Sequence, residues 1–270
     1  MSRSLEEPTG IVEVAVRRWR DGSWENADDL VADEVPVALT FNSIPHVVML
    51  ATPRDLEDLG RGFAFTEALV AHPSEIRATE LKHDGDALEV ALSVPQERLV
   101  ALLTQRRNLT GRTGCGVCGA ETIAEAIRRP GPVAAGGSIA RELLARALRE
   151  MRDWQQLNAA TGSLHAAAWV SWQGEIRLVR EDVGRHNALD KVIGALLAAG
   201  ADRADGFLLV TSRASYEMAQ KTATAGVRML VAVSAPTALA VRLADEAGLT
   251  LVGFARDTQQ VVYTHPERVT

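Results

Sequence analysis

The spacing of apolar residues changes along the chain and divides it into two parts. Up to about residue 107 the apolar positions alternate in short runs, the period of a half-buried β-strand. Segment 42–45 separates two such runs and predicts a hairpin turn, while Thr52 followed by Pro53 predicts a helix that continues to about residue 70. The predicted strands of this part are 11–19, 35–41, 46–50, 75–82 and 87–93, followed by a helix at 95–107.

From residue 138 onward, helical and extended segments alternate. Segments 207–210 and 229–233 are continuous apolar runs, which are typical of strands covered on both faces by helices. The predicted strands are 163–171, 176–181, 206–211, 228–233 and 249–254, and the predicted helices are 138–154, 186–199, 215–225 and 236–247. The pattern predicts an α/β core with a mostly parallel sheet at 138–270, a smaller β-rich N-terminal lobe at 1–107, and a junction at 108–137.

Composition narrows the class of protein. The chain has 270 residues, of which 47% are hydrophobic and 24% charged, as in ordinary soluble globular proteins. A net charge of −6 argues against nucleic acid as the main partner. The first eight residues lack an apolar signal core, and no window approaches the ~18 apolar residues of a membrane span. We therefore expect a cytoplasmic protein whose thiols stay reduced.

The two cysteines of the chain, Cys115 and Cys118, form a CxxC pair flanked by glycines. Such a pair can bind a metal, form a short disulfide or carry sulfur. A structural zinc needs four ligands, and no second CxxC or suitably spaced histidine pair is present, so we expect no tightly held structural metal. Nearby Arg106, Arg107 and Arg112 favour the thiolate form, which suits the transfer of sulfur.

A second candidate site lies where three predicted strands end and helices begin. In open α/β sheets, ligands bind beyond the carboxyl ends of the strands. Arg185 and Arg213, with Ser212 and Ser234, would form a site for phosphate or pyrophosphate, and Asp182 would accept hydrogen bonds from a base or a ribose hydroxyl. The alternative for the hydroxyl residues, namely Ser212, Ser215, Ser234 and Thr237, is that they are plain helix N-caps.

Two histidines near this edge leave alternatives open. His186 is a candidate general base, or simply the first residue of a helix held by Asp182. His165, at the start of a predicted strand, is either a ligand contact or a satisfied interior histidine.

Several segments together resemble a known family, the formate dehydrogenase accessory sulfurtransferases (the FdhD family). The cysteine segment 108–119, with the sequence NLTGRTGCGVCG, carries the resemblance most specifically. The other matching segments, in chain order across nearly the whole protein, are 34–39, 46–53, 181–191, 212–218, 233–237 and 249–254.

The resemblance implies a function and a fold. Members of the family accept sulfur from a cysteine desulfurase as a cysteine persulfide, which would form on Cys115, with Cys118 as an assisting or resolving thiol. They pass the sulfur to the molybdenum (or tungsten) bis(molybdopterin guanine dinucleotide) cofactor before it enters formate dehydrogenase. The implied fold is a cytidine-deaminase-like three-layer α/β/α core with a smaller lobe, and the implied assembly is a homodimer.

The resemblance also implies that the segment after the last predicted strand contacts the cofactor. The family pattern is Phe-x-Arg-x-Gly-Arg, and the corresponding residues here are Phe254, Ala255, Arg256, Asp257, Thr258 and Gln259. The glycine and the second arginine are replaced by Thr258 and Gln259. The departure shifts the expected contacts toward Arg256, the backbone and Arg213.

Two other functions remain open from the sequence. The chain could be a non-catalytic molybdenum-cofactor chaperone whose cysteines only tune binding. A zinc-dependent deaminase is disfavoured, because no His-x-Glu motif accompanies the cysteines.

Overall fold

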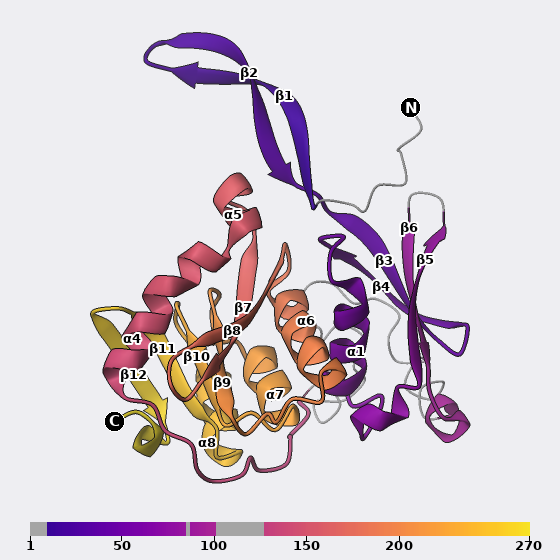
Figure 1. Cartoon of the computed structure of the whole chain (residues 1–270), viewed down its shortest axis with the longest axis vertical. Coiled ribbons are helices and arrows are strands. Elements are labelled where there is room, and N and C mark those ends of the chain that lie inside the picture. Colours follow the sequence, from indigo (N-terminus) through magenta and orange to yellow (C-terminus); the bar gives the residue numbers. More distant parts are fainter. Residues whose placement is uncertain (1–9, 85–86, 101–126) are drawn as a thin grey trace.

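The computed structural model of the protein describes residues 10–84, 87–100 and 127–270. Its strands form three sheets: a two-stranded arm, a four-stranded sheet in the N-terminal lobe and a six-stranded sheet in the core (Figure 1). Cys115 and Cys118, and the second half of the helix predicted at 95–107, lie outside the described residues.

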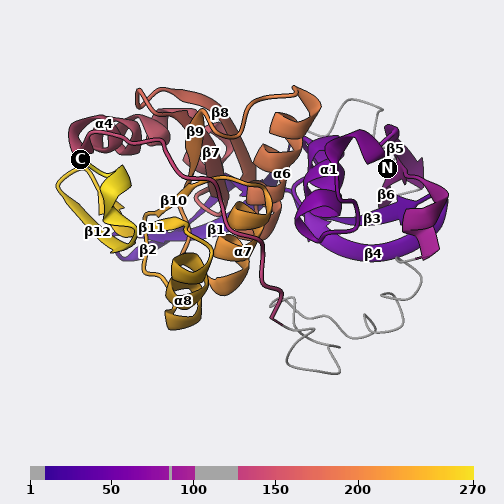
Figure 2. The ribbon, with the colours of Figure 1, turned by 90° about the horizontal axis from the view of Figure 1, so that it is seen from below.

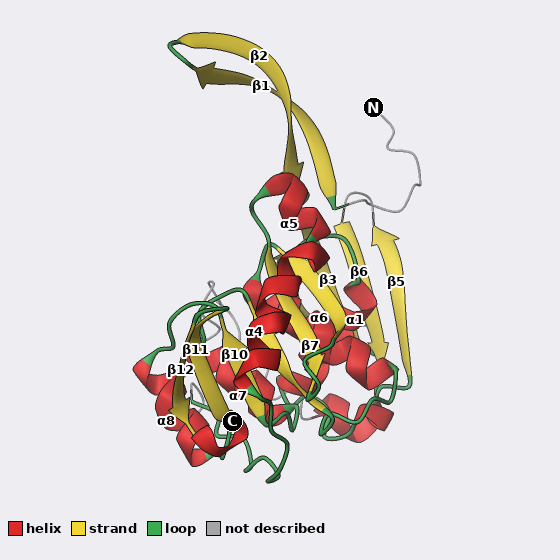
Figure 3. Ribbon diagram, turned by 60° about the vertical axis from the view of Figure 1, so that its left-hand side comes forward, coloured by secondary structure: helices red, strands yellow, loops and turns green. Residues whose placement is uncertain are grey.

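The arm is a β-hairpin that projects from the body of the molecule (Figures 1 and 3). Strands β1 (Ile11–Arg20) and β2 (Ser23–Ala32) pair antiparallel along their full length. Residues 21–22 form the turn with φ values of 51° and 86°, the left-handed conformation of favoured two-residue hairpins. Near the tip, the rings of Trp19 and Trp24 pack edge to face with centroids 5.3 Å apart. Strand β2 was not predicted, because its mostly polar, exposed sequence lacks alternation.

The N-terminal lobe is a four-stranded sheet in the order β4-β3-β6-β5, in which only the β3–β6 pair is parallel. Its strands are β3 (Val35–Phe41), β4 (Ile44–Ala51), β5 (Ala78–Asp84) and β6 (Ala87–Ser93). The predicted β3–β4 hairpin is confirmed, although its turn needs only Asn42 and Ser43, with φ values of 48° and 66°.

Helix α1 (Leu56–Thr66) is shorter than predicted at both ends. The expected cap at Thr52 is wrong, because the helix begins after Asp55, which has a φ of 53° and makes no side-chain cap. The hydroxyl of Thr52 instead accepts a hydrogen bond from the backbone of Val183, at 3.2 Å, in the other lobe. A contact between lobes thus replaces the local cap.

The core sheet has the strand order β12-β11-β10-β9-β7-β8. Its strands are β7 (His165–Ser171), β8 (Ile176–Asp182), β9 (Gly206–Val210), β10 (Met229–Ala232), β11 (Thr250–Arg256) and β12 (Gln259–Thr264). Strands β9, β10 and β11 pair in parallel, but β7 pairs antiparallel with both β8 and β9, and β12 pairs antiparallel with β11. The prediction of a mostly parallel sheet is therefore corrected to a mixed sheet, since short hairpin connections at its two edges force antiparallel pairing.

Helices cover both faces of this sheet. The helices are α4 (Arg141–Glu150), α5 (Gln156–Thr161), α6 (Arg185–Ala198), α7 (Tyr216–Thr224) and α8 (Ala238–Glu246), with 3₁₀ turns at Pro73–Glu75, Met151–Trp154 and Pro266–Arg268. Leu208 and Val210 pack in the cluster that contains α6, α7 and α8, whereas Phe207 and Leu209 pack against α4. The predicted three-layer α/β/α core is confirmed, and its cytidine-deaminase-like description stays a prediction.

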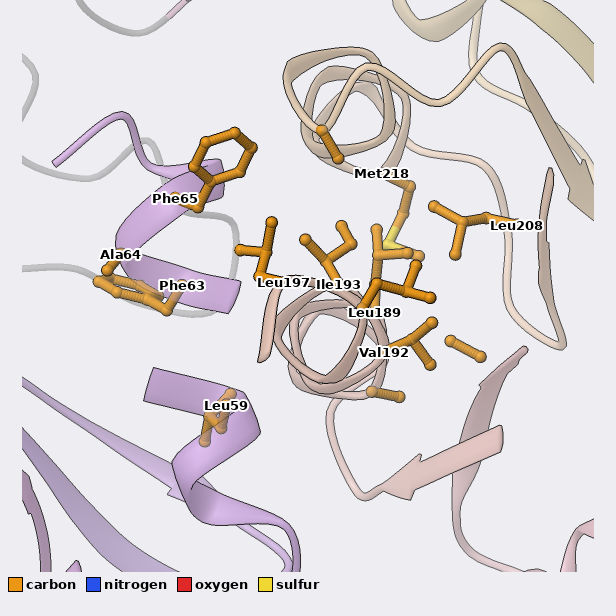
Figure 4. Close-up of a cluster of buried hydrophobic side chains, with 14 of the residues drawn as sticks. Leu59, Phe63, Ala64, Phe65, Leu189, Val192, Ile193, Leu197, Leu208 and Met218 are labelled. Carbon is orange, nitrogen blue, oxygen red and sulfur yellow. The ribbon is translucent and has the colours of Figure 1, made fainter. Parts of the chain in front are cut away.

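Helix α1 of the N-terminal lobe packs directly against α6 of the core (Figure 2). Two glycines make the approach possible: a Cβ on Gly62 would lie 1.8 Å from the carbonyl oxygen of Asp190, and one on Gly194 would lie 1.9 Å from that of Asp58. Apolar side chains of α1, α6, α7 and β9 meet in one buried cluster around this crossing (Figure 4). The hydrophobic core thus runs from one lobe into the other.

A buried ion pair at one end of the crossing joins the lobes. Lys191 Nζ lies 2.6 Å from Asp182 Oδ2 and donates to the carbonyl oxygen of Thr52, and all three residues are fully buried. The backbone N–H of Thr52 donates a hydrogen bond to Asp182. Burial lowers the pKa of Lys191, and the Asp182 carboxylate opposes that shift.

A second buried pair involves Asp190, the residue of α6 that directly precedes Lys191. Lys221 of α7 lies 2.8 Å from Asp190 Oδ2 and 2.9 Å from Glu67 Oε1, and Thr66 Oγ1 donates to Asp190. Burial disfavours the charge of Lys221, but Asp190 and Glu67 outweigh it and raise the pKa of Lys221 to about 12. Burial raises the pKa of Asp190 despite its partner. Helices α1, α6 and α7 are therefore fixed together by charge as well as by packing.

We expect Gly62→Ala to destabilise the fold. The added Cβ would collide with a backbone carbonyl, which cannot rotate away, and overpacking of this kind costs about 1–3 kcal/mol, more than Ala gains in helix propensity. Urea unfolding measures the change, and Gly131→Ala is the control because a Cβ there meets no atom within 4 Å. Equal stability of the two variants would contradict the close crossing.

We expect Asp182→Asn to lower the free energy of unfolding at neutral pH by about 3–5 kcal/mol, because it leaves the buried Lys191 without its partner. A lysine whose folded pKa lies below its usual 10.5 opposes folding at low pH and ceases to do so as pH rises toward 10.5, so the deficit should shrink on alkalinisation. The exposed Asp257→Asn is the control. A loss below 1 kcal/mol, or one that grows with pH, would contradict this role.

Candidate functional site

The three strand-to-helix turns predicted to converge do meet at one edge of the core sheet. The backbone N–H of Ser234 donates to the carbonyl oxygen of Ser212 at 3.4 Å, and that of Phe254 donates to the carbonyl oxygen of Ser234 at 3.1 Å. Strand β8 runs parallel to β9 because β7 is antiparallel to both, so Asp182 reaches the same edge, opposite His165. These residues lie on, or directly after, the five strands β7 to β11.

Asp182 lies at this edge, but its side chain is fully buried and does not reach the solvent-exposed surface. Its two oxygens take donors from Thr52 N, Lys191 Nζ, Gly184 N and Asn187 Nδ2, at 3.1, 2.6, 2.8 and 2.9 Å. A carboxylate has about four lone-pair sites, and here four donors occupy them. The expected role of Asp182 as an acceptor for a base or a ribose is therefore corrected to that of a structural link between lobes.

Helices α6 and α7 begin side by side at the edge, and their first turns carry a mixed charge cluster. His186 Nε2 of α6 lies 2.6 Å from Glu217 Oε2 of α7, and both side chains are mostly shielded from solvent. One alternative from the sequence was that Asp182 holds His186. The structure shows that Glu217 is the partner instead. Burial, together with the charges of Arg185 and His186, lowers the pKa of nearby His165, so His165 is neutral at neutral pH.

Three side-chain atoms in this cluster are buried without a hydrogen-bond partner: Arg185 Nε, His186 Nε2 and Ser215 Oγ. His186 Nε2 is close to Glu217, but the contact does not have hydrogen-bond geometry. Buried polar groups in native proteins are nearly always hydrogen-bonded, so each of these atoms calls for a partner. A ligand that supplies both donors and acceptors would satisfy them.

The cap alternative holds for one of the four hydroxyl residues. Thr237 Oγ1 accepts from the backbone of Ala240 at 3.3 Å and caps α8. Ser215 occupies the N-cap position of α7 but makes no side-chain cap. Ser212 lies three residues before that position, and its hydroxyl donates to the carbonyl oxygen of Arg213.

The predicted cofactor segment lies at the same edge, on the hairpin between β11 and β12. Phe254 has a φ of 48° at an irregularity in the β11–β12 register and is 39% exposed, an unusual conformation for a bulky residue. Ala255 is buried, Arg256 is exposed, residues 257–258 form the turn, and Gln259 begins β12. Arg213, on the loop after β9, is also exposed. The edge thus presents two accessible guanidinium groups and one aromatic ring.

The described chain resumes after the cysteine segment at residue 127, beside this edge. Arg128 Nη1 lies 2.9 Å from Glu67 Oε2, and the hydroxyl of Tyr216, the first residue of α7, donates to the carbonyl oxygen of Arg128 at 2.8 Å. Arg128, the second described residue after the cysteine segment, is thereby held at the start of α7.

Within residues 10–84, 87–100 and 127–270, no three His, Cys, Asp or Glu side chains lie close enough to hold a metal ion. The expectation that no structural metal is held stays a prediction. In the same residues, no helix is long and apolar enough to cross a membrane.

Sequence reasoning missed one residue of the cluster, Glu217. An acidic residue in the first turn of a helix is common for electrostatic reasons, so its position alone gives no functional signal. The useful signal was its place two residues after Ser215, on a turn already predicted to reach the edge.

Comparison with known proteins gives a consistent result. Residues 32–270 match the FdhD/NarQ family. The chain is 51% identical over 260 residues to the sulfur carrier protein FdhD of Xanthomonas campestris pv. campestris (strain B100), covering 96% of this chain and 92% of the relative. It is 49% identical over 263 residues to the sulfur carrier protein FdhD of Cupriavidus necator, covering 97% and 91%.

A solved structure agrees with the sequence matches. The crystal structure of a protein assigned as a formate dehydrogenase accessory protein, from Desulfotalea psychrophila, superposes with a TM-score of 0.76 at 25% identity, covering 96% of this chain and 99% of that one. The mixed α/β architecture is therefore shared, and the chain belongs to the FdhD/NarQ family.

Proposed function

We propose that this protein is a sulfurtransferase that carries persulfide sulfur on Cys115 and delivers it to a molybdenum bis(molybdopterin guanine dinucleotide) acceptor for formate dehydrogenase. The observation that carries the proposal is the roughly half-identical match, over nearly the whole chain, to proteins named as sulfur carriers. The name of the structural neighbour supports formate dehydrogenase as the target.

The loading step is a thiol exchange without net oxidation. The Cys115 thiolate attacks the outer sulfur of a persulfide on a cysteine desulfurase. A new S–S bond forms on Cys115, the S–S bond of the donor breaks, and the donor leaves as a thiolate. The three arginines near the pair in sequence, Arg106, Arg107 and Arg112, favour the thiolate that this step requires.

Cys118 would act as the resolving thiol in the release of the sulfur. Its thiolate would attack the inner sulfur of the Cys115 persulfide, form a Cys115–Cys118 disulfide and expel hydrosulfide toward the acceptor. A cellular dithiol would then reduce the disulfide and return both thiols.

The acceptor is a substrate of the protein, and the edge of the core sheet suits its nucleotide part. Exposed Arg213 and Arg256 supply guanidinium groups for a pyrophosphate, and Ser212 and Ser234 lie on the adjoining turns. Because Thr258 and Gln259 replace the glycine and arginine of the family pattern, binding relies here more on Arg256, Arg213 and the backbone.

The sulfur donor, the assembly and the compartment are proposed from the same family membership. We propose a cysteine desulfurase as the donor, a homodimer as the assembly and the cytoplasm as the compartment, where reduced thiols are available for loading. The acidic net charge of −6 fits the absence of nucleic acid from this scheme.

We expect Cys115→Ala to abolish maturation of formate dehydrogenase while leaving the fold and nucleotide binding intact. A strain that lacks the native gene and carries the variant would contain assembled but sulfur-free, inactive dehydrogenase. Cys118→Ala is the comparison variant, since it keeps the carrier thiol and should still take up sulfur, while it loses the proposed release step. Full dehydrogenase activity with Cys115→Ala would contradict the persulfide role.

The second candidate function is a non-catalytic cofactor chaperone, favoured by the exposed guanidinium groups of Arg213 and Arg256 at the sheet edge. In that case Cys115→Ala would weaken retention of the cofactor, and another protein would transfer the sulfur. Measuring cofactor bound to purified wild type and variant separates the two: equal retention with lost dehydrogenase activity supports sulfur transfer.

A further inference from the structure

An arginine–glutamate ion pair holds the described chain on each side of residues 101–126, the stretch that contains both cysteines. Arg98 pairs with Glu75 before this stretch, and Arg128 pairs with Glu67 after it. We call the first pair the entry clamp and the second pair the exit clamp. Both glutamates belong to the N-terminal lobe, so the two clamps attach the cysteine-bearing stretch to the same part of the molecule.

The entry clamp is a bidentate ion pair. Arg98 Nε lies 3.0 Å from Glu75 Oε2, and Arg98 Nη2 lies 2.9 Å from Glu75 Oε1. The hydrogen bond from Arg98, followed by that from the backbone of Ala71, lowers the pKa of Glu75 to about 2, so the pair is charged at neutral pH. Surface ion pairs hold a chain in place mainly when their geometry is bidentate. Leu99, the next residue, is buried in the core and fixes the chain at the same point.

The exit clamp joins the two lobes. Arg128 Nη1 lies 2.9 Å from Glu67 Oε2 and 2.7 Å from the backbone oxygen of Glu67. The other carboxylate oxygen of Glu67 lies 2.9 Å from Nζ of the buried Lys221. On the core side, the hydroxyl of Tyr216 donates to the carbonyl oxygen of Arg128, and burial raises the pKa of Tyr216, so this hydroxyl is protonated at neutral pH. Arg128 is therefore held through its side chain and its backbone.

The two glutamates lie on one short stretch of chain that follows α1. Glu67 and Glu75 are eight positions apart. Even a fully extended chain of this length spans only about 29 Å, so the backbones of the two glutamates lie no further apart than that. Leu69 and Val70, between them, are buried and fix the stretch to the lobe. A chain attached at two such points explores less space than a chain attached at one, which raises the effective concentration of its reactive groups at a fixed target.

We propose that the two clamps position the cysteine-bearing stretch for sulfur delivery, with Arg98 and Arg128 as positioning residues. The proposal rests on the proposed function, in which Cys115 carries sulfur to an acceptor bound elsewhere on this protein. Delivery then requires the sulfur to reach a fixed place, and a misplacement of about 1 Å can slow such a reaction about a hundredfold. Reaction of the persulfide with a small thiol needs no such placement, because that thiol diffuses to the sulfur.

A simpler reading is that the clamps only stabilise the fold. Each arginine can be removed without leaving its glutamate unpartnered, because Glu67 keeps Lys221 and Glu75 keeps the backbone N–H of Ala71. The arginine side chains are also partly exposed, at 34% and 35%. A purely structural role predicts that sulfur delivery falls only as far as the amount of folded protein falls.

The test compares Arg98→Ala and Arg128→Ala with the wild type in the full chain. Each protein is incubated with a cysteine desulfurase and cysteine, and a mass gain of about 32 Da measures its loading with sulfur. Both loaded variants should lose sulfur to dithiothreitol at a rate within about twofold of the wild type. In a strain that lacks the native gene, formate dehydrogenase activity per amount of soluble variant should fall about tenfold or more.

Three further variants serve as controls. Arg177→Ala removes an exposed arginine that pairs with Glu175 at 3.2 Å at the start of β8, and it should change neither rate nor activity. Arg128→Lys keeps a positive charge beside Glu67 and should recover most of the lost activity. If Arg128→Ala does not fold, Tyr216→Phe tests the exit clamp by removing only one hydroxyl, and it should also lower dehydrogenase activity.

The outcomes separate the positioning role from the function on which it rests. Dehydrogenase activity within about twofold of the wild type in both arginine-to-alanine variants would overturn the positioning role. A loss of activity matched by an equal loss of folded protein, measured by urea unfolding, would overturn it as well. A wild type that takes up no sulfur would instead overturn the proposed function itself.

Discussion

The close crossing of α1 and α6 is the constraint on which the rest of the structure depends. Gly62 and Gly194 let each helix touch the backbone of the other, so neither can shift without a steric clash. The Asp182–Lys191 and Asp190–Lys221 pairs then fix the crossing from within, where an unpartnered charge is costly. Because α6 and α7 are held in this way, their first turns are fixed at the edge of the sheet.

Much of the fold was predictable from local pattern. The apolar runs of β9 and β10 and the turns after them gave the core and its edge, because burial on both faces and helix starts leave local signals. Strand β2 escaped prediction because its mostly polar and exposed residues do not alternate with apolar ones, and the antiparallel edges of the core escaped because strand direction depends on distant partners.

The site was likewise predictable where it depends on local pattern and not where it depends on distant partners. The meeting of Ser212, Ser234 and Phe254 followed from topology, which the sequence pattern indicates. The burial of Asp182 did not, because its partners include Thr52 in the other lobe. Glu217 was missed for a similar reason, since its meaning comes from lying beside His186, 31 positions earlier in the chain.

The proposed function assigns sulfur carriage and recognition of the acceptor to different parts of the chain. Under that proposal, recognition would fall to the sheet edge, whose turns are hydrogen-bonded to one another, and rigid placement of a site on helix starts favours selectivity. The chain returning from the cysteine segment is anchored at the first residue of α7, through Tyr216 and Arg128. The anchor places Arg128 at the start of a helix that reaches the candidate edge.

The central claim, that Cys115 carries sulfur, is tested most directly by the intact mass of the purified protein. After incubation with a cysteine desulfurase and cysteine, the wild type should gain about 32 Da, the mass of one sulfur atom, and a reducing thiol should remove it. Cys115→Ala should show no such gain. A wild type that gains no mass, or a Cys115→Ala variant that gains as much as the wild type, would contradict the account.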